Sequence, residues 1–518
     1  MSKRDLLTLA LAGTLLLSAT ACGAGAASGG APAPAAAAVQ YAPPMEAMDG
    51  GVDWNTEEYS HIQENGFRAV AVSPLSTFAA DVDTASYANL RRMILAGRDV
   101  PADAVRIEEM VNYFHYDYPQ PGEGEPFSVS TEIAPCPWNT DTRLLRVGLQ
   151  AEQPDWEAMP PSNLVFLIDV SGSMDSYDKL PLVKQAFLLL TEHLRPDDVI
   201  SIVTYASSDR VVLDGATGDE GADIQAAIED LSAGGSTAGS AGIQTAYELA
   251  ERHFIPGGNN RVILATDGDL NVGVTSEGEL VRLVEEKKRG GVFLSVMGFG
   301  TGNIKDNKME ALADHGDGNY SYIDSVLEAK RVLVEEMGGT LFTVAKDVKF
   351  QVEFNPETVK GYRLIGYENR LMAAEDFADD AKDGGEVGAG HRVTALYELA
   401  LADSPMEVPG AELKYQTAQG TGSGEFLTVS VRYKEPGGDV SELREYPVGA
   451  EALADKASED TAFAGCVAQF GMLLRESEYA GTASYAGILE QLEGLDGVAG
   501  DPYKEEFSYL VKQMARKG

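Results

Sequence analysis

Three oxygen-bearing side chains lie within five residues of one another in this chain. Asp169, Ser171 and Ser173 occupy alternate positions, with Gly172 between the two serines. Oxygens at i, i+2 and i+4 of a tight turn can converge on a hard divalent cation. Aspartate and serine also form turns and helix N-caps, and this structural role is the alternative for the same residues.

The segments around this stretch predict where its oxygens lie. The apolar run over residues 164–168 is typical of a strand that is buried on both faces. Apolar residues at helical spacing follow it, at Val183, Phe187, Leu190 and Leu194. A buried strand, an oxygen-rich turn and a helix form the entry to an α/β sheet. In such sheets ligands bind at the carboxyl ends of the strands.

The Asp-x-Ser-x-Ser pattern resembles the metal-ion-dependent adhesion site of von Willebrand factor type A domains. Family sites draw on two further loops, and this chain offers a candidate for each. The Gly-rich residues 234–239 contain Thr237 and precede a predicted helix over 241–252. A predicted buried strand over 261–265 runs into Asp267. All three pieces occur in the family's order, which favours a metal site over a set of turn caps.

The resemblance implies a metal site made of Asp169, Ser171, Ser173, Thr237 and Asp267. The three hydroxyls would contact the ion directly. The two aspartates would hold metal-bound water or coordinate directly in another conformation. Neutral hydroxyls leave the charge of the ion uncancelled, so a Mg²⁺ ion, or Mn²⁺ or Ca²⁺ in its place, keeps an open position. An Asp or Glu of a protein partner can fill that position.

The predicted function is metal-dependent binding of a protein partner, in adhesion or in envelope assembly. We predict no catalytic residue, because no nucleophile–base pair or second metal cluster is apparent. The Gly-rich stretch over 234–242 lacks the lysine of a P-loop. A metal with an open position can activate water, so a metal-dependent hydrolase remains an alternative. A structural envelope scaffold with a non-essential metal site is the other alternative.

The fold class predicted for the centre of the chain is α/β, over residues 160–345. Its strands alternate with helical segments, which predicts a Rossmann-like, mainly parallel sheet with helices on both faces. Strand-like alternation occurs before it, at 145–149, and after it, at 348–354 and 427–433. This pattern suggests one β-sandwich interrupted by an insertion, and two separate β modules would produce the same pattern.

The 518 residues therefore predict several domains. Residues 74–78, Pro-Leu-Ser-Thr-Phe, and 81–87, Asp-Val-Asp-Thr-Ala-Ser-Tyr, resemble the N-terminal module of bacterial lipoproteins with one type A domain. Residues 383–398 resemble the C-terminal portion of that family. The predicted segments are a signal peptide (1–21), an Ala/Gly/Pro-rich tether (22–60), the N-terminal module (61–159), the type A domain (160–345), a β-rich module (346–445) and a helical C-terminal region (446–518).

The first residues predict an exported, lipid-anchored protein. Lys3 and Arg4 precede an apolar run over 6–17, which is too short to span a bilayer. The residues that follow lead to Cys22 and resemble a bacterial lipoprotein signal, whose cleavage makes the cysteine the lipidated N-terminus. Ordinary secretion is the alternative. Acyl chains on Cys22 would hold the protein at a bacterial membrane, outside the cytoplasm in the cell envelope.

The charge balance limits the classes of binding partner, and the cysteines leave two interpretations open. The chain has 40 Lys plus Arg against 81 Asp plus Glu, a formal net charge of −41. This balance repels nucleic acid and anionic membrane surfaces, so we expect no nucleic-acid partner. Cys136 and Cys466 could form a disulfide or remain two buried thiols.

Two aspartates of the N-terminal module have an enzymatic and a structural interpretation. Asp81 and Asp83 resemble part of the Asp-x-Asp-x-Thr motif of haloacid dehalogenase-like phosphotransferases. In this chain Thr84 falls one position early and Ala85 fills its place. We therefore predict that Asp83 and Thr84 cap a helix at the end of a strand.

Overall fold

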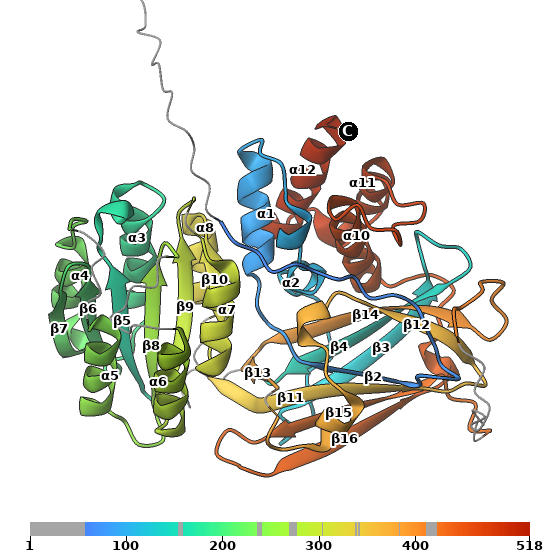
Figure 1. Ribbon diagram of the computed structural model, residues 1–518, viewed down its shortest axis with the longest axis horizontal. Helices are drawn as coiled ribbons and strands as arrows, with labels where there is room; N and C mark the ends of the chain where they lie inside the picture. The colour runs from blue at the N-terminus through green and yellow to red at the C-terminus, as the bar shows by residue number, and fades with distance from the viewer. Residues whose placement is uncertain are drawn as a thin grey trace, which may run out of the picture. The chain divides into compact units, whose positions relative to one another are not determined.

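The computed structural model describes residues 57–153, 159–235, 241–268, 277–302, 304–336, 339, 342–382, 384–410 and 422–517. Within these residues three sheets form, one in an α/β domain and two in a β-sandwich (Figure 1). Among the same residues no helix is long and apolar enough to cross a membrane.

The α/β domain is built on a six-stranded sheet in the order β10-β9-β8-β5-β6-β7. Its strands are β5 (Ser162–Asp169), β6 (Val199–Tyr205), β7 (Asp209–Thr217), β8 (Asn259–Thr266), β9 (Phe293–Phe299) and β10 (Tyr320–Ile323). All neighbours pair in parallel except β6 and β7. Every residue of β5 and β8 is buried, as expected for central strands covered on both faces.

Helices cover both faces of this sheet. One apolar core joins it to α3 (Leu180–Thr191), α4 (Gly221–Glu229) and α8 (Val326–Lys330), and α8 continues into one π-helical turn, η4 (Arg331–Glu335). A second core joins the opposite face to α5 (Gly242–Arg252), α6 (Glu277–Arg289) and α7 (Asp306–His315). The predicted α/β fold class is thus confirmed.

The β-sandwich combines strands from both sides of the α/β domain in the sequence. One sheet has the order β1-β12-β14-β4-β3, with β1 (Arg68–Ala69), β3 (Phe127–Pro135), β4 (Arg143–Ala151), β12 (Val359–Ile365) and β14 (Arg392–Leu401). The other has the order β13-β11-β15-β16, with β2 paired to β11; its strands are β2 (Leu75–Ala79), β11 (Thr343–Phe354), β13 (Gly385–Gly388), β15 (Leu427–Lys434) and β16 (Ser441–Val448). A single apolar core lies between the two sheets. The two β-rich segments therefore form one sandwich, which the α/β domain interrupts.

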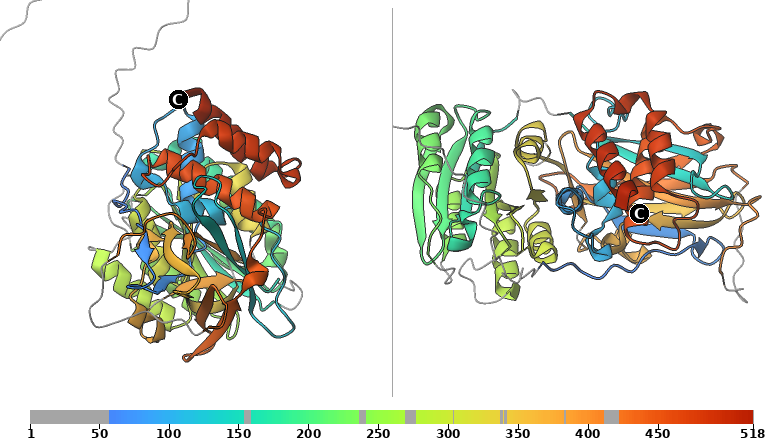
Figure 2. Two further views of the ribbon diagram at one scale, coloured as in Figure 1. Left: turned by 90° about the vertical axis from the view of Figure 1, so that its right-hand side faces the viewer. Right: turned by 90° about the horizontal axis from the view of Figure 1, so that it is seen from above.

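Helices from the two ends of the described chain share a fourth core. The N-terminal pair is α1 (Ala85–Leu95) and α2 (Ile107–Asn112), and the C-terminal set is α10 (Glu459–Leu474), α11 (Tyr485–Glu493) and α12 (Pro502–Lys517). Figures 1 and 2 show α12 beside α1. Cys136 and Cys466 are both buried in this core as free thiols, so they do not form a disulfide.

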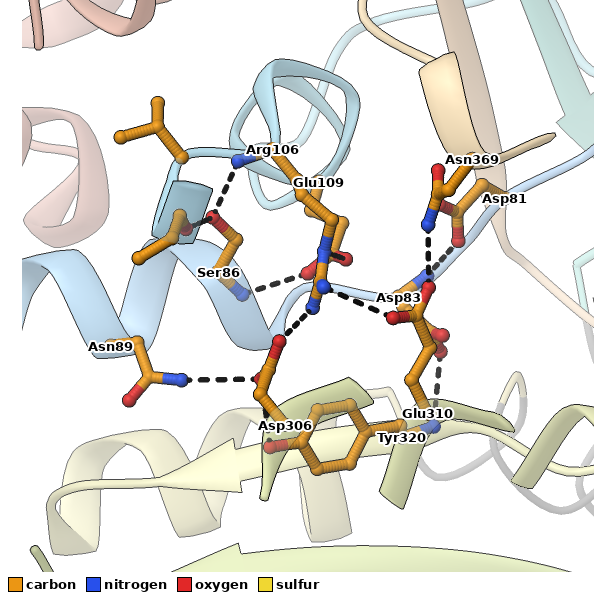
Figure 3. Close-up of polar contacts among 12 residues, drawn as sticks. Asp81, Asp83, Ser86, Asn89, Arg106, Glu109, Asp306, Glu310, Tyr320 and Asn369 are labelled. Atoms are coloured by element: carbon orange, nitrogen blue, oxygen red, sulfur yellow. Dashed lines mark hydrogen bonds and ion pairs between the residues drawn. The ribbon is translucent and has the colours of Figure 1, made fainter. Parts of the chain in front are cut away.

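A cluster of buried charges joins α1 and α2 to the α/β domain (Figure 3). The guanidinium of Arg106 lies 2.7 Å from Asp306 Oδ2 and 3.0 Å from Glu310 Oε2, and it also pairs with Glu109. Arg370 forms a second set of ion pairs that shares Glu310 with the first. We call both sets together the ionic cluster; its members are Asp81, Asp83, Arg106, Glu109, Asp306, Glu310, Asp314 and Arg370.

The prediction of a helix cap at Asp83 and Thr84 is confirmed in its position, at the start of α1, and wrong in its capping hydrogen bond. Thr84 stands at the N-cap position of α1 but makes no side-chain capping hydrogen bond. Its hydroxyl accepts a hydrogen bond of 2.7 Å from Arg331, and Asp83 accepts one of 3.0 Å from the backbone N–H of Tyr320. Both residues contact the α/β domain instead, and the N–H of Ser86 in the first turn of α1 donates to Glu109 Oε2 at 2.7 Å.

Candidate metal centre

Two neighbouring strands bring the predicted aspartates to one edge of the sheet. The strands β5 and β8 are paired in parallel, with Ile168 opposite Ala265. Asp169 is the last residue of β5, and Asp267 directly follows the end of β8. Because parallel strands end at the same edge, the two carboxylates emerge side by side. Both aspartates are buried.

The turn after β5 brings its two serines together. The backbone N–H of Ser171 donates to Asp169 Oδ1 at 2.8 Å, which orients the carboxylate. The hydroxyls of Ser171 and Ser173 lie 2.9 Å apart. Ser171 is buried and Ser173 is exposed, so this pair of hydroxyls extends from the carboxylates to the protein surface.

The backbone holds the second predicted loop against the first. The N–H of Gly172 donates to the carbonyl of Gly235 at 3.1 Å, and the N–H of Gly234 donates to the carbonyl of Val170 at 2.8 Å. Gly235 has φ +86°, and a Cβ there would lie 2.6 Å from Ser207 Oγ, so this position requires glycine. Thr237, which was predicted as a ligand, lies outside the described residues, as does Cys22, the predicted lipidation site.

Two carboxylate oxygens at this edge lack compensation. Asp169 Oδ2 and Asp267 Oδ1 are buried and have no hydrogen-bond partner within the described part of the chain. Burial, with a smaller effect of the nearby charge of Asp267, raises the pKa of Asp169 to about 6, against the lowering effect of hydrogen bonding by Ser171 and of the nearby hydroxyl of Tyr205. A buried carboxylate oxygen without a partner is costly, and a bound cation would remove this cost.

The donors present at this edge therefore fit a hard divalent cation. Carboxylate and hydroxyl oxygens are the ligands that Mg²⁺, Mn²⁺ and Ca²⁺ accept, and the unpartnered oxygens provide the negative charge. Within the described residues no group of three or more His, Cys, Asp or Glu side chains could hold a metal. The candidate centre differs from such groups because hydroxyls form much of its donor set.

Lys179, which the sequence analysis did not select, also contacts the candidate centre. Lys179 Nζ lies 2.8 Å from Asp267 Oδ2, and the two side chains are 9% and 0% exposed. Lys179 occupies the N-cap position of α3, so the start of that helix places it at the carboxyl edge of the sheet. Its position just before a predicted helix was the one signal in the sequence that could have pointed to Lys179. Nothing in the sequence relates Lys179 to an aspartate that is 88 residues away.

The surface beside the candidate centre has room for a partner. A hollow of about 430 Å³ adjoins the turn after β5, and its lining includes Val170, Ser207, Arg210 and Gly234. Tyr177, just beyond the turn, is 87% exposed. Exposed tyrosines and arginines are common anchors of protein–protein interfaces.

Comparison with known proteins agrees with the fold of the α/β domain. A family model described as von Willebrand factor type A domain matches residues 163–334, which places the α/β domain in that class. A model described as von Willebrand factor matches residues 53–146, and one described as "Uncharacterized protein YfbK, C-terminal" matches residues 339–516.

One relative is similar over most of the chain. "Uncharacterized protein YfbK" of Escherichia coli (strain K12) is 42% identical over 468 residues, which cover 88% of this chain and 81% of the relative. The chain therefore belongs to the family of YfbK.

Other similarities are more limited. Inter-alpha-trypsin inhibitor heavy chain H3 of Bos taurus is 31% identical over 231 residues, which are 42% of this chain and 26% of that protein. The solved structure titled "von Willebrand factor type A from Catenulispora acidiphila" is 17% identical, with a TM-score of 0.40. The match covers 77% of this chain and 91% of that one.

Proposed function

We propose that this protein binds a protein partner through a divalent metal ion, Mg²⁺ or alternatively Mn²⁺ or Ca²⁺, in adhesion or envelope assembly. The observation that carries the proposal is the pair of buried, unpartnered oxygens on Asp169 and Asp267, beside an exposed hydroxyl on Ser173. Buried charge without a partner is retained in a fold when a ligand compensates it.

In this proposal each residue of the centre has a distinct role. Ser171, Ser173 and Thr237 hold the ion through their hydroxyls, while Asp169 and Asp267 hold it directly or through water. An ion bound mainly by neutral oxygens remains a Lewis acid with a free position. The surface exposure of Ser173 and the adjoining hollow give a partner's Asp or Glu side chain access to that position.

We favour binding over catalysis. The contacts of Asp169, Ser171 and Asp267 among the described residues involve backbone N–H, hydroxyl and ammonium groups, and no histidine or cysteine. In this proposal both carboxylates hold the ion or its water, so neither is assigned as the general base of a hydrolase. A scaffold whose metal site is non-essential is the second candidate, and the ion pair of Lys179 with Asp267 favours it, because the ammonium compensates one carboxylate without a metal.

We further propose that acyl chains on Cys22 anchor the protein outside the cytoplasm at a bacterial membrane. The support comes from the signal-like residues before that cysteine. Intact-mass measurement of the protein purified from membranes should reveal a cleaved, acylated N-terminus. The Cys22→Ser variant should leave the membrane fraction. An unmodified N-terminus in the membrane-purified protein would contradict this anchor.

The metal test is calorimetric titration of Mg²⁺ and Mn²⁺ into the full-length protein. We expect saturable binding in the wild type and its loss in Asp169→Ala. The matched control is Asp175→Ala, which removes an exposed carboxylate from the same turn. Binding that survives Asp169→Ala, or that Asp175→Ala removes equally, would place the metal elsewhere.

The partner test uses the same variants. Envelope proteins crosslinked to the wild type in Mg²⁺ should be lost in EDTA and in Asp169→Ala, and should be retained by Asp175→Ala. A partner that Asp169→Ala captures as well as the wild type would favour the scaffold. Product formation that depends on the metal would favour the hydrolase.

A further inference from the structure

The two oxygens of Asp267 have different surroundings. Oδ2 lies 2.8 Å from the ammonium of Lys179, whereas Oδ1 is buried without a hydrogen-bond partner among the described residues. The same carboxylate therefore pairs with a fixed cation through one oxygen and leaves the other oxygen available to a ligand. An ammonium that holds one oxygen also fixes the direction of the second, because the carboxylate is planar.

Several elements hold Lys179 in this position. Its backbone, at φ −120° and ψ −114°, precedes the first turn of α3. Its aliphatic stem passes over Gly300, where an added Cβ would collide with the lysine chain. Gly300 follows β9 with φ +75°, and its carbonyl accepts a hydrogen bond of 2.5 Å from the buried hydroxyl of Tyr322. The lysine thus lies in a channel that only glycine at position 300 leaves open.

The ammonium changes the charge that a bound ion would experience. Asp169 and Asp267 alone would present two negative charges, and Lys179 offsets one of them. Charges interact strongly at such short separations away from bulk water. A dication in this centre would therefore be less neutralised by the protein, and would attract an external carboxylate more strongly.

We propose that Lys179 is a charge-setting residue of the metal centre: it pairs with Asp267 Oδ2, leaves Oδ1 for the ion, and by offsetting one negative charge keeps the centre dependent on a carboxylate from the partner. This inference rests on the proposed function. In a metal-free protein the same ammonium stabilises Asp267, so the lysine also maintains the edge of the sheet before the ion binds.

The test is a calorimetric titration of Mn²⁺, without any partner, into the full-length wild type and into Lys179→Met. Removing the ammonium should tighten Mn²⁺ binding by about 10- to 100-fold, since one repulsive charge near the ion is lost. The matched control is Lys184→Met, which removes the same charge from α3 at a position where the ammonium donates to the carbonyls of Glu229 and Leu231. Its Mn²⁺ affinity should equal that of the wild type.

A second variant leaves every charge in place. In Gly300→Ala the new methyl group should displace the lysine stem, so Mn²⁺ binding should tighten in the same direction as in Lys179→Met. Circular dichroism verifies the fold of each variant. This variant keeps the inference testable if Lys179→Met fails to fold.

The outcomes separate the inference from the proposed function. Tighter binding in Lys179→Met and Gly300→Ala, but not in Lys184→Met, supports the inference. Binding in the variants with none in the wild type supports it as well, because the ammonium then opposes the ion. Equal or weaker binding in Lys179→Met overturns the inference alone. No binding in the wild type or in any variant overturns the proposed metal centre, and the inference with it.

Discussion

Two buried polar regions of this molecule differ in how their carboxylates are paired with cations. In the ionic cluster each carboxylate has an arginine at ion-pair distance; Arg106 pairs with Glu109, Asp306 and Glu310, and Arg370 pairs with Asp81, Asp83, Asp314 and Glu310. In the candidate metal centre, Lys179 pairs with Asp267, and one oxygen of Asp267 and one of Asp169 have no hydrogen-bond partner among the described residues.

The difference shows how to distinguish a structural charge cluster from a candidate binding site. Paired charges hold the start of α2 against the α/β domain, and their geometry needs no ligand. Acidic crowding still leaves a cost there, since burial first and the neighbouring Asp81 second raise the pKa of Asp83. Asp81 Oδ2 in the cluster also has no hydrogen bond among the described residues, but it lies 3.4 Å from Arg370 Nε. The centre is set apart by unpartnered oxygens beside an exposed hydroxyl, rather than by the number of its acidic residues.

The largest effect that would sharpen this comparison is expected in the ionic cluster. Arg106→Met removes the guanidinium that Glu109, Asp306 and Glu310 share, and leaves buried carboxylates uncompensated. The free energy of unfolding should fall by about 3–5 kcal/mol, measured by urea denaturation.

Its control is Arg252→Met, which removes an exposed pair with Asp214 and should change stability by less than about 1 kcal/mol. Mn²⁺ affinity should be unchanged in both arginine variants. A large loss of Mn²⁺ binding in Arg106→Met would show that the cluster and the centre act as one unit.

A second prediction concerns Glu108, a buried carboxylate of α2 that shares a feature with the centre. Neither of its oxygens has a hydrogen-bond partner within the described residues. Burial, and then the charge of Glu368, raises the pKa of Glu108 from 4.5 to about 7. The folded protein therefore retains a proton that the unfolded chain releases above pH 4.5, so stability falls as the pH rises from 4.5 to 7.

The Glu108→Gln variant should remove this pH dependence. At pH 8 it should be more stable than the wild type by about 3 kcal/mol, at about 1.4 kcal/mol per pH unit, and at pH 4.5 it should be nearly equal. Urea denaturation at both pH values measures the difference. Glu123→Gln, at an exposed glutamate, is the control. Equal stabilisation at both pH values would mean that folding does not raise the pKa of Glu108.

The smallest effect contrasts two isosteric neutralisations. Asp169→Asn removes a charge whose Oδ2 has no partner, so the metal-free protein should gain about 2 kcal/mol while Mn²⁺ binding is lost. Asp306→Asn instead removes a charge that pairs with Arg106 at 2.7 Å, and should destabilise the protein without affecting Mn²⁺. Thermal unfolding in EDTA measures both changes. Changes of the same sign in the two variants would break the proposed distinction between the regions.

Local patterns were sufficient for the α/β domain. The apolar runs predicted β5 and β8, because strands covered on both faces need continuous apolar sequence. Since parallel strands share a carboxyl edge, the same patterns also placed Asp169 and Asp267 together. The five predicted ligands remain a prediction, with Thr237 outside the described residues.

Long-range pairing was beyond those patterns. Alternation indicated strands before and after the α/β domain, but one sandwich and two modules give the same alternation. The pairing of β4 with β14, which joins Leu145 to Tyr397, decides for one sandwich. Asp83 and Thr84 show the same limit, because a helix cap is a local interaction and their partners Tyr320 and Arg331 lie far along the chain.

By itself, then, the sequence determined the α/β class, the order of its loops and the oxygen-rich edge, because these follow from local periodicity and from the geometry of parallel strands. Only the tertiary structure decided that Lys179 pairs with Asp267, and that Asp83 and Thr84 serve the contact between α1 and the α/β domain. Charges interact through space, so the partner of a buried ion depends on how distant segments pack.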